Sequence, residues 1–545
     1  MNAAYRTRCS IIFFTSVIFY TAVLVNLAII QLVQRPFFTA LANKQYSVRV
    51  TTTPPRALIF DRNGTALVCN KESYSAFITP HKLSDPASLS SFLQQHFPAA
   101  YTQWVCHKNK QFIYVKRRLT AEEYATISDA QIPDIHIMHE PSRWYAHESL
   151  TPVVGTTGID NIGLFGIEQQ YNTTLAGAPS TVTIERDARS GHWHFDQQET
   201  DPGKTGAPIT LTIDSDLQFL AYEELKKTVA EFQAREGALI IMDPYTGHIL
   251  TMTSVPTFNP NEQSVSDLAL TKNRSVSESY EPGSVMKALV GLAALEAGVV
   301  TADEEFDCQN TTQGTLDGMP VSTVLKDGVI PFSRIIERSN NIGIAQVTKR
   351  MGPALYDHLM RLGFGKKTGI TLPGEQPGFI SNPRSWSKRS LISLSFGYEM
   401  TATLLQIAQA FAIIANGGYS INPTIIYTQE NRLGQQLYST ESVNTIKEIL
   451  YNTVTQGTAR RAAIDGYRVM AKTGTANIAV NGSYAVDKNI YTCAAIVERD
   501  GYARVIAAYI RESQLPDCQK LKAATVVVPL IERVMKIMLI HDAIL

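Results

Sequence analysis

The sequence predicts an α/β (α+β) protein whose main domain is a central antiparallel sheet flanked by helices. Two apolar, strand-like runs stand between residues 235 and 255, and three more follow residue 467. Helical patterns fill the stretch between these runs, and an amphipathic pattern covers about 523–540. Strands followed by helices, further strands and a last helix are typical of a largely antiparallel sheet covered by helices.

Composition limits the class of protein. The 545 residues exceed what one hydrophobic core can hold and predict several domains. The 49 Lys and Arg balance 49 Asp and Glu, whereas a nucleic-acid binder normally has a basic excess. With 44% hydrophobic and 18% charged residues, the chain is not mainly disordered or coiled-coil. Six cysteines in so long a chain exclude a disulfide scaffold, and their spacing, which contains no CxxC, indicates no particular pairing.

Residues 11–33 form an uncharged, apolar run of 23 residues. As a helix this run would span roughly 35 Å, enough to cross the roughly 30 Å hydrocarbon core of a bilayer. A cleaved signal peptide is the alternative, but its apolar region usually has only about 7–15 residues. Arg6 and Arg8 precede the run, so the positive-inside rule predicts a cytoplasmic tip at 1–10 and a membrane anchor at 11–33. The bulk of the chain is then expected outside the cytoplasm.

A segment of mixed character follows the anchor, over 34–205. Asn63-Gly64 stands between two apolar runs, which is a strong signal for a β-hairpin. Turn-forming residues crowd the stretch 200–208 and indicate a linker. Asp214 then precedes apolar residues at helical spacing and is expected to cap a helix. The sequence thus predicts a domain boundary near 205 and a second domain over 206–545.

The first of three motifs with chemical meaning is Ser284-Val285-Met286-Lys287. Pro282-Gly283 breaks the chain just before an apolar helical run, so Ser284 is expected in the first helical turn with Lys287 on the same face. The helix N-terminus would supply N–H groups for an oxyanion. A lysine in an apolar setting has a lowered pKa and can take the serine proton. A second SxxK, Ser385–Lys388, lies in polar sequence without such a break, which favours Ser284 as the nucleophile.

The second motif is the SxN triplet Ser339-Asn340-Asn341, which lies between two helical patterns. A loop between helices can aim Ser339 and Asn341 into a cleft, where the hydroxyl would relay a proton and the amide would hold a substrate amide. Further SxN triplets occur at 420–422 and 442–444. The triplet alone is therefore near chance, and its position between the other two motifs is what distinguishes it.

The third motif, Lys472-Thr473-Gly474-Thr475, ends a strand-like run. The backbone of a strand edge can pair with an extended peptide. Lys472 and Thr475 would bind a terminal carboxylate, Gly474 would leave room for close approach, and the Thr475 N–H would complete an oxyanion hole with that of Ser284. KTG also occurs at 204–206 in the linker and at 367–369 in a glycine-rich turn, without a strand before it.

SxxK, SxN and KTG in this order form the motif set of β-lactamases and penicillin-binding proteins. The chain resembles the class B, monofunctional penicillin-binding proteins from the anchor to its end. Further stretches that match boxes of this family are Arg56, Asp61 to Gly64, Arg143 to Tyr145, Gly163 to Glu168, Leu211 to Asp214, Asp243 to Gly247, Asn273-Arg274, Tyr280 to Ser284 and Ser395 to Tyr398. The chain departs from the family at Ala57, Ala146 and Glu399, where glycine, proline and glycine are usual.

The resemblance implies a penicillin-binding, β-lactamase-like transpeptidase domain over 206–545 and a non-catalytic pedestal of the dimerisation type over 34–205. It implies that Ser284 attacks the D-Ala-D-Ala bond of a peptidoglycan stem peptide and releases D-Ala. An amine of a second stem peptide would then resolve the acyl-enzyme and form a cross-link. β-Lactams would acylate Ser284 in the same way.

The resemblance also assigns roles to the other motif residues. Lys287 would act as the base, while Ser339 and Lys472 would assist proton transfer to the leaving amine. Asn341 and Thr475 would hold the donor strand, and Thr473 and Gly474 would belong to the same substrate-binding edge. No metal and no organic cofactor are implied.

Location and partners follow from the same resemblance. It implies a single-pass protein of the bacterial inner (cytoplasmic) membrane with a periplasmic catalytic domain. The sequence has no glycosyltransferase-like region, so a multi-spanning glycan polymerase is expected as partner. Glu281-Pro282-Gly283-Ser284 is most like the septal, penicillin-binding protein 3 subgroup, which implies cell division and divisome partners.

Other functions remain open at this point. An elongation-type transpeptidase and a DD-carboxypeptidase, which uses water as acceptor, would carry the same motifs. A β-lactamase or a penicillin sensor shares them too, but the first rarely has an anchor and a pedestal, and the second would have a cytoplasmic signalling domain. A catalytically silent divisome scaffold is the non-enzyme alternative, against which the three intact motifs argue.

Overall fold

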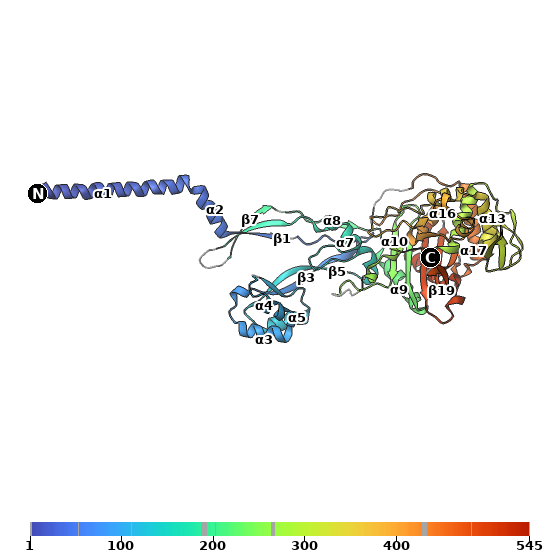
Figure 1. Cartoon of the computed structure of the whole chain (residues 1–545), viewed down its shortest axis with the longest axis horizontal. Helices are drawn as coiled ribbons and strands as arrows, with labels where there is room; N and C mark the ends of the chain where they lie inside the picture. Colours follow the sequence, from blue (N-terminus) through green and yellow to red (C-terminus); the bar gives the residue numbers. More distant parts are fainter. Residues whose placement is uncertain are drawn as a thin grey trace. The chain divides into compact units, whose positions relative to one another are not determined.

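The structure is a computed structural model, and it describes residues 3–543 apart from 53, 111, 187–192, 202, 263–266, 428–432 and 481. Two compact units are present (Figure 1). One comprises Met1–Arg56 with Ala176–Gly206, and the other comprises Ala57–Leu175 with Ala207–Leu545. The predicted 34–205 domain thus contributes to both units, and the boundary near 205 stays a prediction.

The first unit contains the apolar helix. Its elements are α1 (Ala3–Ala28), a π-helical turn (Ile29–Val33), α2 (Arg35–Tyr46), β1 (Ser47–Thr52), β6 (Ser180–Arg186) and β7 (Trp193–Asp201). Within the described chain, the stretch Tyr5–Val33 is the one helix long and apolar enough to cross a membrane, with a mean hydropathy of 2.2. It includes the whole predicted anchor, 11–33. The three strands form an antiparallel sheet in the order β1-β6-β7.

The first part of the second unit is a small sheet with three helices. Its elements are β2 (Ile59–Phe60), β3 (Ala66–Ile78), α3 (Pro86–His96), α4 (Pro98–Cys106), β4 (Ile113–Lys116), α5 (Ala121–Ala130), β5 (Ile135–Tyr145) and β8 (Ile209–Thr210). The hairpin predicted at Asn63-Gly64 is confirmed, because β2 and β3 pair across it. The Asp61 carboxylate accepts the N–H groups of Asn63 and Thr65, which fixes this turn.

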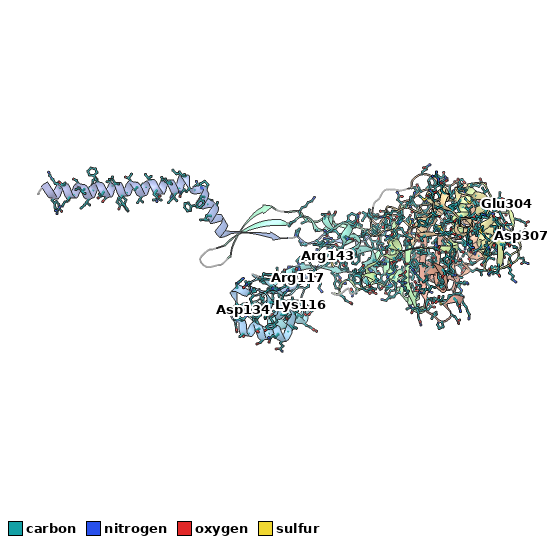
Figure 2. The ribbon with its side chains drawn as sticks, in the orientation of Figure 1. Lys116, Arg117, Asp134, Arg143, Glu304 and Asp307 are labelled. Carbon is teal, nitrogen blue, oxygen red and sulfur yellow. The ribbon has the colours of Figure 1, made fainter. Side chains whose placement is uncertain are left out.

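Two of the family boxes meet in a buried ion pair in this part of the chain. Arg143, labelled in Figure 2, donates from Nε to Oε1 of Glu168 at 2.9 Å. Both side chains are almost fully buried. Removing one partner of such a pair leaves an uncompensated buried charge, which destabilises the fold. Arg143 and Glu168 are therefore expected to be needed together.

A five-stranded antiparallel sheet in the order β10-β9-β20-β19-β18 forms the centre of the second unit. The strands are β9 (Ala234–Met242), β10 (Ile249–Val255), β18 (Arg468–Val480), β19 (Ser483–Arg499) and β20 (Tyr502–Ser513). These are the five strand-like runs of the sequence, so the predicted antiparallel sheet is confirmed. β18 lies at one edge of the sheet.

Helices cover both faces of this sheet (Figure 1). They are α9 (Ser215–Glu231), α11 (Met286–Glu296), α16 (Leu404–Ala415) and α19 (Val528–His541). Alternate residues of β9 point to opposite faces. Leu239 and Ile241 share a core with α9 and α19, while Ala238 and Ile240 share another with α11 and α16. Asp214 caps α9 as predicted, accepting the N–H of Leu217.

Shorter elements complete the second unit. The helices are α6 (Thr151–Val154), α7 (Gly166–Gln170), α8 (Asn172–Ala176), α10 (Arg274–Ser277), α12 (Phe332–Glu337), α13 (Asn341–Met351), α14 (Ala354–Arg361), α15 (Ser390–Ser395), α17 (Thr440–Thr455) and α18 (Ala523–Val526). The strands are β11 (Ser279–Tyr280), β12 (Glu305–Asp307), β13 (Gln313–Leu316), β14 (Met319–Ser322), β15 (Val329–Pro331), β16 (Phe379–Ile380) and β17 (Met400–Thr403). The closing helix predicted over 523–540 is therefore two helices, α18 and α19.

Candidate active site

Residues of all three motifs meet at one cavity of ≈ 490 Å³. Ser284, Ser339, Thr473 and Thr475 line it. They come from the start of α11, from the loop between α12 and α13, and from the edge strand β18. Helix starts and strand edges are where backbone groups lack intrinsic partners, so this is a place where a substrate can complete the hydrogen bonding.

Ser284 lies in a tight turn at the start of α11. It occupies the 3₁₀ turn Gly283–Val285 that leads directly into this helix, and the prediction placed it in the first helical turn itself. Gly283 has φ 63°, which a side chain rarely tolerates. A Cβ on Gly397 would lie 2.3 Å from the carbonyl oxygen of Gly283, so the segment Ser395 to Tyr398 packs directly against the nucleophile turn. The Ser284 hydroxyl itself makes no hydrogen bond with another described residue.

Lys287 connects the first motif to the second. Its side chain is fully buried. Nζ donates to the carbonyl oxygen of Ser339 at 2.6 Å, to Oγ of Ser339 at 3.0 Å and to Oδ1 of Asn341. All of these acceptors are neutral, so none of them compensates a buried positive charge.

The Ser339 hydroxyl lies between two buried lysines. Lys472, also fully buried, donates to Oγ of Ser339 at 3.2 Å and to the carbonyl oxygen of Thr473 at 3.1 Å. Burial, together with the charge of Lys472, holds the pKa of Lys287 well below its ordinary value. Burial also lowers the pKa of Lys472 to about 7. The lowered pKa of Lys287 favours its neutral form, which can act as a base, whereas Lys472 holds its proton on a large fraction of the molecules at neutral pH.

The SxN loop is held in an unusual backbone conformation. Ser339 has φ 60°, a left-handed geometry that costs a non-glycine residue roughly 1–3 kcal/mol. Asn340 caps α13 by accepting the N–H groups of Ile342 and Gly343, and its amide donates to Asp327. These bonds fix the loop, so that Ser339 and Asn341 both reach Lys287.

The KTG segment lies on β18, the strand at one edge of the central sheet. The N–H of Asn477 points away from β19, because it donates to the hydroxyl of Tyr398 at 3.1 Å. Alternate residues of a strand direct their N–H groups to the same side, so the N–H of Thr475 also points outward. That orientation is the one an oxyanion hole with Ser284 requires, and it leaves the edge able to pair with an extended peptide.

Gly474 is a glycine for a different reason than the sequence suggested. A Cβ there would lie 2.7 Å from the carbonyl oxygen of Pro282 and 3.0 Å from the backbone nitrogen of Val285. The close approach is thus that of the nucleophile turn to β18. Gly474 lets the first and third motifs come together.

Several residues of the cavity belong to no motif. Thr458 lies with its hydroxyl 3.1 Å from that of Thr473, and Lys522 and Arg338 also line the cavity. None of the described residues that line the cavity is acidic. The backbone N–H of Ala523, next to Lys522, donates to the Thr475 hydroxyl at 3.1 Å. The positive lining suits a carboxylate, and only the tertiary structure brings these residues to the site.

The second copies of the motifs lie elsewhere. Ser385 and Lys388 are exposed, and the hydroxyl of Ser385 donates to a neighbouring backbone carbonyl. In the glycine-rich turn, Thr368 is held by Glu375 through its N–H and its hydroxyl. Neither copy reaches the cavity.

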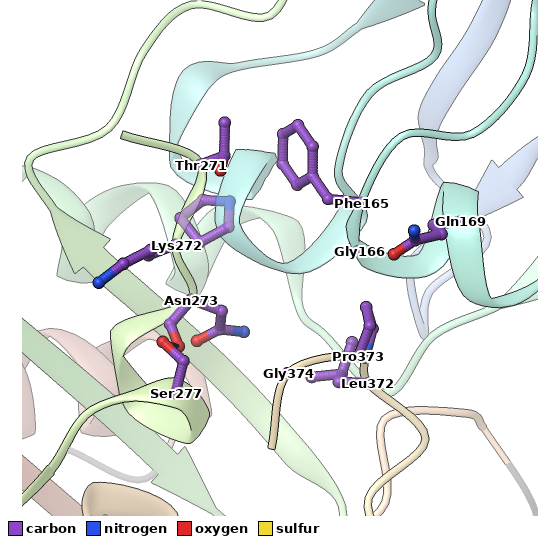
Figure 3. Close-up of a pocket in the computed structure, with 11 residues that line it drawn as sticks. Phe165, Gly166, Gln169, Thr271, Lys272, Asn273, Ser277, Leu372, Pro373 and Gly374 are labelled. Atoms are coloured by element: carbon purple, nitrogen blue, oxygen red, sulfur yellow. Dashed lines mark hydrogen bonds between the residues drawn. The ribbon is translucent and has the colours of Figure 1, made fainter. Parts of the chain in front are cut away.

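Another cavity, of ≈ 260 Å³, is lined by other residues than those of the three motifs, and Figure 3 shows its lining. Phe165, Thr271, Lys272 and Pro373 are among its lining residues. Among its described lining residues no nucleophile is paired with a base, so the chemistry points to the Ser284 cavity. Among the residues that the structure describes, no group of three or more His, Cys, Asp and Glu side chains is placed to hold a metal ion.

Comparison with known protein families gives two matches. Residues 237–535 match the penicillin binding protein transpeptidase domain, and residues 51–211 match the penicillin-binding protein dimerisation domain. The first match contains all three motifs. Together the two matches cover most of the chain beyond the apolar helix.

Curated relatives carry related names. The chain is 30% identical over 438 residues to the probable peptidoglycan D,D-transpeptidase PbpC of Pseudomonas aeruginosa, covering 79% of this chain and 77% of the relative. It is 28% identical over 450 residues to the peptidoglycan D,D-transpeptidase FtsI of Escherichia coli, covering 80% and 76%. It is 28% identical over 529 residues to stage V sporulation protein D of Bacillus subtilis, covering 93% and 81%.

Solved structures share the fold. A peptidoglycan synthetase from Bifidobacterium adolescentis superposes with a TM-score of 0.71 at 22% identity, covering 91% of this chain and 97% of that one. Penicillin binding protein 3 from Mycobacterium tuberculosis, complexed with aztreonam, superposes with a TM-score of 0.68 at 24% identity, covering 91% and 98%.

Proposed function

Because the chain belongs to the class B penicillin-binding proteins and is a peptidoglycan D,D-transpeptidase, we propose that Ser284 is its nucleophile. The observation that supports this assignment best is the pair of fully buried lysines that bracket the Ser339 hydroxyl beside Ser284. Such an arrangement provides a base and a proton donor within one hydrogen-bonded group. The substrate is a stem peptide that ends in D-Ala-D-Ala, and β-lactams acylate the same serine.

The acylation step uses Lys287 as the base. The neutral amine takes the proton of the Ser284 hydroxyl as Oγ forms a bond to the penultimate D-Ala carbonyl carbon. The N–H groups of Ser284 and Thr475 stabilise the resulting oxyanion. The amide C–N bond then breaks, and the terminal D-Ala leaves.

The leaving amine needs a proton, and Ser339 with Lys472 supplies it. The Ser339 hydroxyl donates to the amine and is reprotonated from Lys472, whose pKa of about 7 suits a donor at neutral pH. Asn341 and the outward backbone of β18 hold the donor peptide, and Thr473 and Thr475 hold its terminal carboxylate beside Lys522. The amine of a second stem peptide replaces D-Ala and attacks the acyl-enzyme, which regenerates Ser284.

A fluorescent penicillin tests the nucleophile on the full chain. Wild-type protein is expected to form a covalent adduct, and Ser284→Ala is expected to form none. Ser385→Ala is the matched control, because Ser385 begins the second SxxK motif and is exposed, and this variant should label like wild type. Label retained on Ser284→Ala, or absent from the wild type, would overturn the assignment.

For the whole protein we propose a septal transpeptidase anchored by residues 11–33, with a cytoplasmic tip at 1–10 and the catalytic domain outside the cytoplasm. Arg6 and Arg8 before the apolar helix support this orientation. The Glu-Pro-Gly-Ser sequence at Ser284 and the relative named FtsI support the septal role. A multi-spanning glycan polymerase and divisome proteins are the proposed partners. A tagged chain should gather at division sites, and a purely lateral distribution would contradict the septal role.

A further inference from the structure

A second cavity, of ≈ 290 Å³, adjoins the catalytic one. We name it the side pocket, and it is lined by Val321, Ser322, Asn341, Arg389, Ser393, Phe396, Tyr398, Glu399, Asn477 and Tyr484. It shares Asn477 with the catalytic cavity and contains Asn341 of the SxN motif. The side pocket therefore borders the catalytic cavity at Asn477.

The edge of β18 determines which part of the donor peptide arrives there. Pairing antiparallel to β18, with its C-terminal carboxylate toward Thr473, the donor runs upstream toward Asn477. At Asn477 the outward N–H is already taken by the hydroxyl of Tyr398. Backbone pairing ends at that point, so the residue just upstream of D-Ala-D-Ala lies at the mouth of the side pocket.

One charge in the side pocket comes from Glu399, at a position where the family usually has glycine. Glu399 has a φ of 57°, a backbone conformation that is strained for residues other than glycine. Its Oε2 accepts the Ser390 hydroxyl at 2.7 Å, and its backbone N–H donates to Glu281 at 2.9 Å. The strain and these bonds hold a carboxylate at the pocket wall, and strain kept at a rim of this kind points to function.

The opposite charge comes from Arg389, at the other end of α15. Arg389 is exposed, and its guanidinium makes no hydrogen bond or ion pair with any described residue. Tyr398 and Tyr484 pack edge to face at 5.0 Å and form an apolar wall. The side pocket thus offers a carboxylate, a guanidinium and an aromatic wall for an aliphatic stem.

We infer that the side pocket binds the residue just upstream of D-Ala-D-Ala in the donor, and that this residue is a diamino acid whose side chain ends in both an ammonium and a carboxylate. This inference rests on the proposed function. In a cross-linking reaction donor and acceptor are the same kind of stem peptide, so the donor also carries the amine-bearing residue. Glu399 pairs with the ammonium and Arg389 with the carboxylate, since charge-assisted bonds are the strong ones.

Three stem peptides test the inference on the full chain in detergent. Their third residue is diaminopimelate, the same residue with its side-chain carboxylate amidated, or lysine. Acylation is measured by competition with the fluorescent penicillin. Wild type should react about tenfold faster with the diaminopimelate peptide than with the other two, as expected for one lost charge-assisted bond.

The variants separate the two charges. Arg389→Gln should remove the preference for the free carboxylate over its amide, and Glu399→Gln should slow the diaminopimelate and lysine peptides by about the same tenfold factor. Glu399→Gly removes the carboxylate and also relieves the strained φ, so it is not expected to impair folding. It should slow the same two peptides by the same factor, which separates lost binding from a folding defect. Lys388→Gln is the matched control, because Lys388 is exposed and does not line the pocket.

Penicillin labelling separates failure of this inference from failure of the proposed function. If wild type labels but the three peptides compete equally, or none competes, the side pocket has no such role and Ser284 remains the nucleophile. If wild type does not label, the proposed function itself fails. Unchanged discrimination in Arg389→Gln and Glu399→Gln would also overturn the inference.

Discussion

Two regions of this protein contain the same short motifs and put them in opposite environments. The catalytic cavity has an SxxK lysine, Lys287, and a KTG lysine, Lys472, and both are fully buried. The surface stretch 366–388 has their counterparts, Lys367 and Lys388, and both are exposed. Burial lowers the pKa of a lysine because the charged form loses its hydration. The same SxxK and KTG motifs therefore form a catalytic site only where the fold buries their lysines.

The largest expected effect is that of removing the buried base. Lys287→Ala should slow acylation by the fluorescent penicillin by roughly 10²–10⁴-fold, as is typical for loss of a general base. Lys388→Ala, the same change in the exposed copy, should leave the second-order rate constant unchanged. Equal effects of the two variants on the rate constant would contradict the claim that only the buried copy of the motif is catalytic. Circular dichroism should show that both variants are folded.

The next largest effect concerns two of the three KTG glycines, Gly474 and Gly369. Gly474→Ala places a Cβ 2.7 Å from the Pro282 carbonyl oxygen, so the Ser284 turn must move. A displacement of about 1 Å from reactive geometry costs roughly 10²-fold in rate. Gly369→Ala meets no atom within 4 Å, but Gly369 has φ +86°. It should therefore lower stability by about 1 kcal/mol and leave the acylation rate unchanged.

The smallest effect is that of a change of one pH unit, and it sharpens the comparison between the two buried lysines. Lys287 acts as a neutral amine, so acylation should fall as pH decreases through its lowered pKa. Lys472 acts in its protonated form, so acylation should also fall as pH rises through about 7. The acylation rate constant, measured from pH 5 to 10, should decline about tenfold per unit on the alkaline side at most. In Lys472→Met the alkaline decline should disappear, and a decline that persists would assign it to another group.

The main architecture could be predicted from the sequence because it depends on local patterns of apolar, turn-forming and capping residues. The apolar, strand-like runs at 235–255 and after 467 became the five strands of the central sheet. The turn at Asn63-Gly64 and the cap at Asp214 formed where their side chains satisfy nearby backbone groups. The prediction of a single helix over 523–540 was wrong, because two helices occupy this stretch.

The catalytic motifs could be proposed from order and context, but their contacts could not. No local signal says that Lys287 and Lys472 donate to the same Ser339 hydroxyl, or that Ser339 adopts a left-handed φ. Thr458 and Lys522 belong to no motif and reach the cavity only through the fold. From the sequence, Gly474 is expected to leave room for the close approach of a substrate peptide, whereas in the structure it leaves room for the Ser284 turn.

By itself the sequence determined the apolar helix, the antiparallel sheet with its helices, and the family to which the serine motif belongs. These depend on residues near one another in the chain, whose spacing sets periodicity, turns and caps. Only the tertiary structure decided which copy of each motif is buried, how the lysines share one hydroxyl, and that Arg389 and Glu399 face one pocket beside the nucleophile. Burial and convergence arise from contacts between distant segments, and they set the pKa values and the charge pairing on which the chemistry depends.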